Sequence, residues 1–126
     1  GANRQGGGCS YAYAFTRPSQ LAKGSLGAIH AMEICYVFGN LDYPGMVEFS
    51  ATGQPGATQL SAEMMQHWIN FASDGKPGHV RNDWKAFDES QRNAMFFGDL
   101  SGMRSDHWQA KDKVWKKVPD TLMRKL

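Results

Sequence analysis

Aromatic and small residues alternate near the amino end of the chain. In the run Cys9-Ser10-Tyr11-Ala12-Tyr13-Ala14-Phe15 every second position from Tyr11 onward is aromatic. This period of two predicts a β-strand over residues 10–15. Alanine rather than a charged residue fills the positions between the rings. We therefore expect both faces of the strand to be covered, which is typical of a sheet flanked by helices.

Residues 60–73 carry the clearest helical pattern in the chain. Ser61 is predicted to cap the helix, and Glu63 lies in the first turn, where the helix dipole favours an anion. Residues 74–77, with the sequence Asp-Gly-Lys-Pro, predict the end of the helix, because glycine accepts a left-handed conformation and proline cannot continue a helix. We interpret the apolar stripe as a face packed on the core. The stripe consists of Met64, Met65, Trp68, Phe71 and Ala72.

Shorter elements are predicted before this helix. Residues 29–38 are crowded with apolar side chains and predict a buried helical turn that ends at Gly39-Asn40. Glycines and prolines predict a loop over residues 16–27 and a longer surface loop over residues 41–57.

The remainder of the chain alternates between anchored loops and two short elements. Trp84 and Phe87 are expected to pin a polar loop to the core, and residues 93–99 predict a short strand closed by a turn. Asp106 is predicted to cap a helix over residues 107–118 that Pro119 ends. One face of that helix would carry Trp108, Lys111, Trp115 and Val118.

Length and composition limit the class of protein to which the chain can belong. The 126 residues, 41% of them hydrophobic, suffice for one modest domain. A formal net charge of +2 is too small to indicate a nucleic-acid partner. Six basic and two acidic residues between positions 111 and 125 indicate a solvated helix face. No apolar run approaches the roughly 20 residues that a membrane span needs, so no membrane span is predicted.

The cysteines and the first residues say little about the protein's compartment. Cys9 and Cys35 are able to pair, but without a CxxC spacing they specify neither a disulfide framework nor a zinc site. Two buried thiols without a bridge are the simpler interpretation. Residues 1–8 are glycine-rich and predict a flexible lead-in. Since Gly1 begins the chain and no signal pattern follows it, we expect the natural start to be absent, and the localisation stays unknown.

A lone histidine, His30, precedes the apolar residues 31–38. The approach Lys23-Gly24-Ser25-Leu26-Gly27-Ala28 favours a tight backbone path, so His30 is expected at the top of a turn that faces a cleft. From position alone, both a proton-transfer role and a hydrogen-bonded packing role are open. A metal site formed with Glu33 would need a third ligand, which the spacing does not supply. No cofactor is predicted.

The segment from Gly27 to Asn40, Gly-Ala-Ile-His-Ala-Met-Glu-Ile-Cys-Tyr-Val-Phe-Gly-Asn, resembles the catalytic-histidine motif of type B carboxylesterases, the family of cholinesterases and bacterial para-nitrobenzyl esterases. Residues 64–77 resemble the family's Trp-x-x-Phe-Ala helix with its Gly-x-Pro stop, and Trp84-Lys85-Ala86-Phe87 resembles its next aromatic pair. The family commonly has proline at the position of Lys85 and often threonine at that of Asp74. The similarity spans residues 10–99.

The resemblance implies the C-terminal part of an α/β-hydrolase fold, with the last parallel strands and their flanking helices. Residues 1–126 would be one segment of a single carboxylesterase domain, incomplete without the remainder of that domain. The triad of this fold runs in the order serine, acid, histidine, so the resemblance implies that His30 is the triad histidine and that the other two members lie upstream. Ser25 is not expected to be the nucleophile, because Lys23 stands where the Gly-x-Ser-x-Gly elbow requires glycine.

The activity implied for the intact protein is hydrolysis of a small-molecule carboxylic ester without a cofactor, and this chain alone is expected to be inactive. His30 would take the serine proton and return it to the departing alkoxide. Glu33 lies too close in the chain to orient the imidazole and is expected to be structural. His67, His79 and His107 are expected at the surface or rim. The alternative is a relative that keeps the fold, lacks the nucleophile and works in binding or adhesion.

Overall fold

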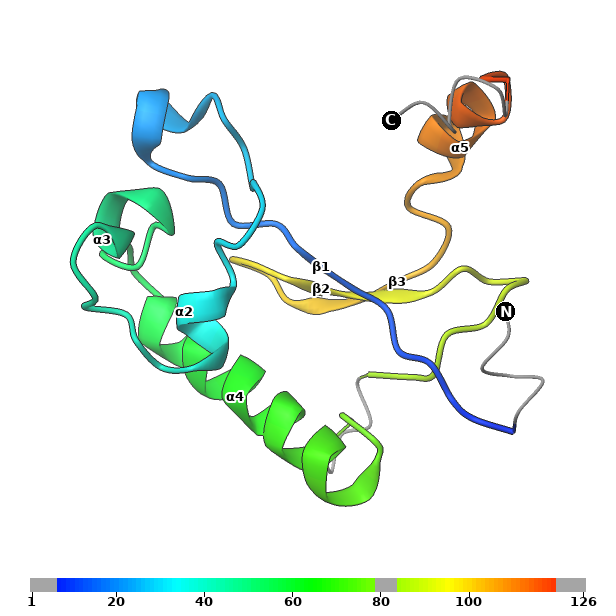
Figure 1. Ribbon diagram of the computed structural model, residues 1–126, viewed down its shortest axis with the longest axis horizontal. Coiled ribbons are helices and arrows are strands. Elements are labelled where there is room, and N and C mark those ends of the chain that lie inside the picture. Colours follow the sequence, from blue (N-terminus) through cyan, green and yellow to red (C-terminus); the bar gives the residue numbers. More distant parts are fainter. Residues whose placement is uncertain (1–6, 79–83, 120–126) are drawn as a thin grey trace.

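The computed structural model describes residues 7–78 and 84–119. It has the α/β organisation that the sequence predicts, with a three-stranded sheet and helices on its two sides (Figure 1). Figure 1 shows α2 and α4 on one side of the sheet and α5 on the other. In chain order the elements are β1 (Tyr13–Phe15), η1 (Leu21–Gly24), α2 (Ile34–Val37), α3 (Met46–Phe49), α4 (Ala57–Asp74), β2 (Ala94–Phe97), β3 (Gly102–Arg104) and α5 (Gln109–Trp115).

Strand β2 is the centre of the sheet. It runs parallel to β1, with Phe15 opposite Phe97, and antiparallel to β3, with Met95 opposite Met103. All four residues of β2 are buried. The strand predicted at residues 93–99 is therefore confirmed, whereas β3 was not predicted because its three residues are too few to show a period.

Strand β1 is shorter than the strand predicted at residues 10–15. Its regular part covers three residues, although the Ala12 carbonyl still accepts a hydrogen bond from the Met95 N–H at 2.9 Å. Tyr13 is 39% exposed. The expectation that both faces are covered is thus met only in part within the described residues.

Helix α4 begins earlier than the sequence predicted. Gly56, with a φ of 80°, is the residue before its first turn, and Ser61 lies inside the helix, so the cap assigned to Ser61 was wrong. The Ser61 hydroxyl instead donates to the Tyr36 carbonyl oxygen at 2.7 Å and joins α4 to α2. The predicted end is confirmed, since Gly75 has a φ of 68° and its N–H donates to the Phe71 carbonyl at 2.9 Å.

The core lies between β2, α2 and α4. Trp84, predicted to anchor its loop, is buried, but Phe71 of the predicted stripe is 49% exposed. The buried face of α4 is rotated from the predicted stripe, because Tyr36 and the neighbouring residues of α2 pack on it. The buried α4 residues are Ala57, Leu60, Ser61, Met64 and His67.

The segments predicted as a long loop and a last helix also differ from expectation. Residues 41–57 contain α3, and Ser50 is fully buried, so this loop is not confined to the surface. Helix α5 is shorter than the predicted helix over residues 107–118, and Asp106 makes no side-chain cap on it. The ring of Trp108 instead stacks on Phe96 at a centroid distance of 5.3 Å and ties the start of α5 to the sheet.

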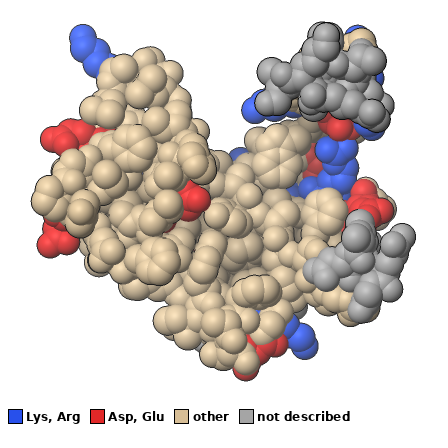
Figure 2. All heavy atoms as spheres, viewed as in Figure 1, with Lys and Arg blue, Asp and Glu red and all other residues tan. Residues whose placement is uncertain are grey.

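Several remaining expectations concern the surface and the termini. Cys9 is exposed, so the interpretation of two buried thiols was wrong for it, while Cys35 is buried. Residues 1–6 of the predicted lead-in lie outside the described residues. On the face in Figure 2 acidic and basic side chains are scattered among mostly uncharged residues, and the net charge of the chain is small. Within the described ranges no helix combines the length and apolar character needed to cross a membrane.

Candidate catalytic histidine

His30 lies in the turn that leads into α2. The turn covers residues 30–33 and is followed by Ile34, the first residue of α2. His30 is exposed, as the glycine-containing approach predicted. Ala31 has a φ of 68°, in the left-handed region that residues with a side chain rarely adopt. The imidazole at this sharp bend is therefore accessible from the surface.

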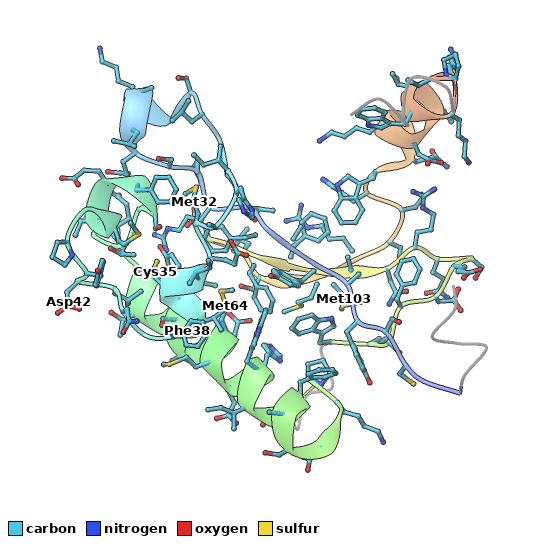
Figure 3. The ribbon with its side chains drawn as sticks, in the orientation of Figure 1. Met32, Cys35, Phe38, Asp42, Met64 and Met103 are labelled. Atoms are coloured by element: carbon cyan, nitrogen blue, oxygen red, sulfur yellow. The ribbon has the colours of Figure 1, made fainter. Side chains whose placement is uncertain are left out.

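Neighbouring buried side chains hold this turn in place. Met32 is fully buried, and the Ile29 N–H donates to its Sδ at 3.2 Å. The Cys35 thiol donates to the Met32 carbonyl at 3.4 Å. Figure 3 shows Cys35 and Met64 where α2 meets α4, with Met32 on the side of the preceding turn. The backbone around His30 is therefore fixed although its side chain is at the surface.

Glu33 contacts a tyrosine of the sheet. The Tyr13 hydroxyl donates to Glu33 Oε1 at 3.3 Å. Burial raises the pKa of Tyr13, and the charge of Glu33 and this hydrogen bond raise it further. The contact links the start of α2 to β1, which is a structural role of the kind expected for Glu33.

The expectation of a surface or rim position for His67 was wrong. Its side chain is 3% exposed, and its Nδ1 lies 2.7 Å from the Pro77 carbonyl oxygen. In a neutral ring Nδ1 therefore carries the proton. Its ring meets Trp84 edge to face at a centroid distance of 5.4 Å. His67 is buried because it follows Met64 at helical spacing on the inner face of α4.

The other residues considered for chemistry lie elsewhere. His107 is exposed, as expected, and its ring contacts Phe96 at 4.6 Å. His79 lies outside the described residues. Ser25 is exposed in the turn after η1. In the part of the chain that the structure describes, no group of three or more His, Cys, Asp or Glu side chains is placed to hold a metal ion.

Three cavities formed by the described residues lie away from His30. One of about 590 Å³ is lined by residues that include Arg17, Glu63 and Asp99. Another of about 350 Å³ has an aromatic wall that includes Trp68 and Trp84. A third of about 340 Å³ shares Arg17 and Asp99 with the first. His30 lines none of these three cavities.

Arg17 is a polar residue of this region that the sequence did not single out. It is 5% exposed, and its Nη2 donates to the Pro55 carbonyl at 2.6 Å. A charged residue shortly after a strand is ordinarily expected at the surface. The burial depends on partners far away in the sequence, so no local signal predicted it.

The fold of this chain is similar to that of solved carboxylesterases. The chain superposes on a Geobacillus stearothermophilus carboxylesterase with a TM-score of 0.70 and 27% identity, covering 89% of this chain and 23% of that one. On a para-nitrobenzyl (PNB) esterase the TM-score is 0.69 with 28% identity, over 86% of this chain and 22% of that one. These similarities confirm the predicted fold class.

Residues 2–115 match the model of the Carboxylesterase family, and the chain belongs to this family. It is 36% identical over 80 residues to the para-nitrobenzyl esterase of Bacillus subtilis (strain 168), which covers 63% of this chain and 16% of that protein. The family that the histidine motif suggested is thus confirmed. The chain spans less than a quarter of the length of each of these relatives.

Proposed function

We propose that the intact protein hydrolyses carboxylic esters as a serine esterase, with His30 as general base and general acid. Membership of the Carboxylesterase family supports the reaction class. The assignment of His30 depends on one observation: the residue is exposed on a fixed turn between β1 and α2, within the segment that resembles the family's histidine motif. An imidazole so placed is accessible to a nucleophile from another part of the domain.

In the proposed mechanism the neutral imidazole of His30 takes the proton of a serine hydroxyl while that oxygen attacks the ester carbonyl. The imidazolium then gives the proton to the departing alkoxide. Water, deprotonated by the same ring, releases the acid and regenerates the serine. Histidine suits this role because its ordinary pKa lies near neutral pH, so it is able both to accept and to donate.

The proposal makes residues 1–126 the C-terminal part of one α/β-hydrolase domain. The remainder of the domain would supply the serine, the acid that orients the imidazole, and the oxyanion donors. Glu33 is unsuited to the role of that acid because it lies only three residues from His30 in the chain, and its carboxylate accepts a hydrogen bond from Tyr13 of β1 instead. A small-molecule ester is the substrate class that this chemistry requires.

The test compares hydrolysis of a chromogenic ester by the intact protein and by its His30→Ala and His107→Ala variants. His107 is a matched control, because it too is an exposed histidine outside the helices and strands. We expect His30→Ala to lower kcat by at least about 10⁴-fold, as removal of a triad histidine does in other serine hydrolases. The His107→Ala variant is expected to keep the wild-type rate. Near-wild-type turnover by His30→Ala would refute the proposal.

A further inference from the structure

Arg17 places a cation inside the protein two residues after β1. Its side chain is 5% exposed, its Nη2 donates to the Pro55 carbonyl at 2.6 Å, and the same atom lies 3.6 Å from Asp99 Oδ1. A buried guanidinium is unfavourable unless hydrogen bonds and an opposite charge compensate it. These partners therefore fix the position of the side chain.

The guanidinium also reaches the helix that follows His30. Tyr36 of α2 is fully buried, and its hydroxyl donates to the Ser50 carbonyl at 2.8 Å. Burial raises the pKa of Tyr36 to about 12, and the positive charge and hydrogen bond of Arg17 oppose this rise. The guanidinium of Arg17 therefore acts electrostatically on the phenol, and the phenol oxygen is held by Ser50 in the loop before α4.

The partners of Arg17 come from three separate parts of the chain. Pro55 precedes α4, Asp99 follows β2 and Tyr36 belongs to α2. Both parallel strands end here, since Arg17 follows β1 and Asp99 follows β2. Arg17 therefore holds the start of α4 to the carboxyl end of the sheet. Helix α4 in turn holds α2, because the Ser61 hydroxyl donates to the Tyr36 carbonyl oxygen at 2.7 Å.

The position of α2 determines that of the His30 turn. The N–H groups of Tyr36 and Val37 both donate to the Glu33 carbonyl at 3.0 Å, so the turn and the helix form one hydrogen-bonded unit. We propose that Arg17 is a positioning residue for catalysis, because its buried guanidinium, through α4, holds α2 and with it the imidazole of His30 in the geometry that proton transfer needs. This inference rests on the proposed function of His30.

Lysine is not equivalent to arginine at this site. The planar guanidinium presents several N–H groups and is able to serve a carbonyl, a phenol and a carboxylate together, whereas a lysine ammonium is a single point charge. Arg17→Lys keeps the positive charge but loses the planar set of N–H donors. A displacement of about 1 Å in a catalytic group is able to lower a rate about 100-fold.

The experiment measures the acylation rate per active site in the intact protein. Active sites are counted by titration with a chromogenic phosphonate ester, so loss of folded protein is separated from slower chemistry. We expect Arg17→Lys to acylate about 10 to 100 times more slowly per titrated site than the wild type, with a smaller change in KM. Arg104→Lys is the matched control, because Arg104 is an exposed arginine whose guanidinium lies over the Phe96 ring. It is expected to keep the wild-type rate.

A second variant keeps the inference testable if Arg17→Lys fails to fold. Tyr36→Phe keeps the buried ring and removes the phenol oxygen on which the charge of Arg17 acts, and it too is expected to acylate more slowly per site. Wild-type rates per site in every variant that folds, with only fewer sites, would show a structural role and overturn the inference. Loss of activity in His30→Ala together with that result would leave the proposed function intact. Full activity in His30→Ala would refute the function itself.

Discussion

Tyr36 carries a hydroxyl group into the core of the protein. The hydroxyl is retained there because it donates to the Ser50 carbonyl at 2.8 Å and the positive charge of Arg17 acts on it. Ser61 and His67 are buried on the same principle, since each has a carbonyl partner within 2.7 Å. At the residue scale, buried polar groups with distant partners determine how α2, α4 and the loops fit together.

The Tyr36 phenol predicts a loss of stability at alkaline pH. Its pKa rises from 10.0 in the unfolded chain to about 12 in the fold. The folded protein therefore holds this proton more tightly, and the stabilisation, fully present below pH 10, is lost as the pH rises towards 12. The free energy of unfolding of the intact protein, measured against pH, should fall less steeply in this window for Tyr36→Phe. Parallel curves for the variant and the wild type would contradict the assignment.

Ala31 predicts a measurable effect of backbone strain. Its φ of 68° is tolerated by glycine, whereas a Cβ makes it unfavourable. We expect Ala31→Gly to change the free energy of unfolding of the intact protein by no more than about 1 kcal/mol, because relief of strain is offset by greater freedom in the unfolded chain. Ala31→Val, with a branched side chain, should lower stability clearly. Equal melting temperatures for the two variants would contradict a left-handed residue at this position.

At the element scale, α5 is attached to the sheet by charges and rings. Arg92 Nη1 lies 2.8 Å from Asp112 Oδ2, and Lys116 Nζ lies 2.8 Å from the same oxygen. Hydrogen bonds from Lys116 and then from Arg92 lower the pKa of Asp112. Since the folded pKa is depressed, the attachment is present above the ordinary carboxyl pKa of 3.8 and is lost as the pH falls below it.

This attachment predicts local opening of α5 when Arg92 is replaced. In Arg92→Met the backbone amides of residues 112–116 should exchange with solvent faster, while exchange in α4 stays unchanged. Hydrogen exchange followed by mass spectrometry measures both. The control is Lys85→Met, which removes an exposed cation from another part of the chain. Unchanged exchange in α5 of Arg92→Met would show that the stacking of Trp108 on Phe96 suffices to hold the helix.

An element was predictable from the sequence where residues within that element determine its structure, and not where the determining contacts come from distant segments. The end of α4 and the strand β2 were predicted because glycine, proline and apolar runs act locally. The burial of Ser61 and His67 was not, because their carbonyl partners belong to other segments. For the candidate site, the turn at His30 followed from its glycines, whereas Arg17 lacked any local signal for burial.

On the scale of the whole molecule, both edge strands of the sheet, β1 and β3, lack a second partner within the described residues. Within the described residues β1 pairs with β2 alone, and large apolar side chains such as Ile69 and Phe71 of α4 are 58% and 49% exposed. An unpaired strand edge beside exposed apolar surface favours aggregation. In the proposed larger domain this surface would be covered by the rest of the hydrolase.

The isolated chain is therefore predicted to fold poorly and to lack esterase activity. It should bind a hydrophobic dye, sediment as aggregates and show no sharp thermal transition. It should not hydrolyse a chromogenic ester, because the nucleophile and the oxyanion donors provide most of the rate enhancement in this mechanism. A cooperative melt from a monomer would contradict the folding prediction. Saturable turnover that His30→Ala abolishes would contradict the predicted inactivity.

The central claim is that the imidazole of His30 carries the proton, and chemical rescue tests it most directly. Ester hydrolysis by the His30→Ala variant of the intact protein is measured with and without added imidazole, beside His107→Ala. The account predicts a severe loss in His30→Ala, partial recovery that saturates with imidazole, and no effect of imidazole on His107→Ala beyond its background reaction. Wild-type hydrolysis by His30→Ala without imidazole would contradict it.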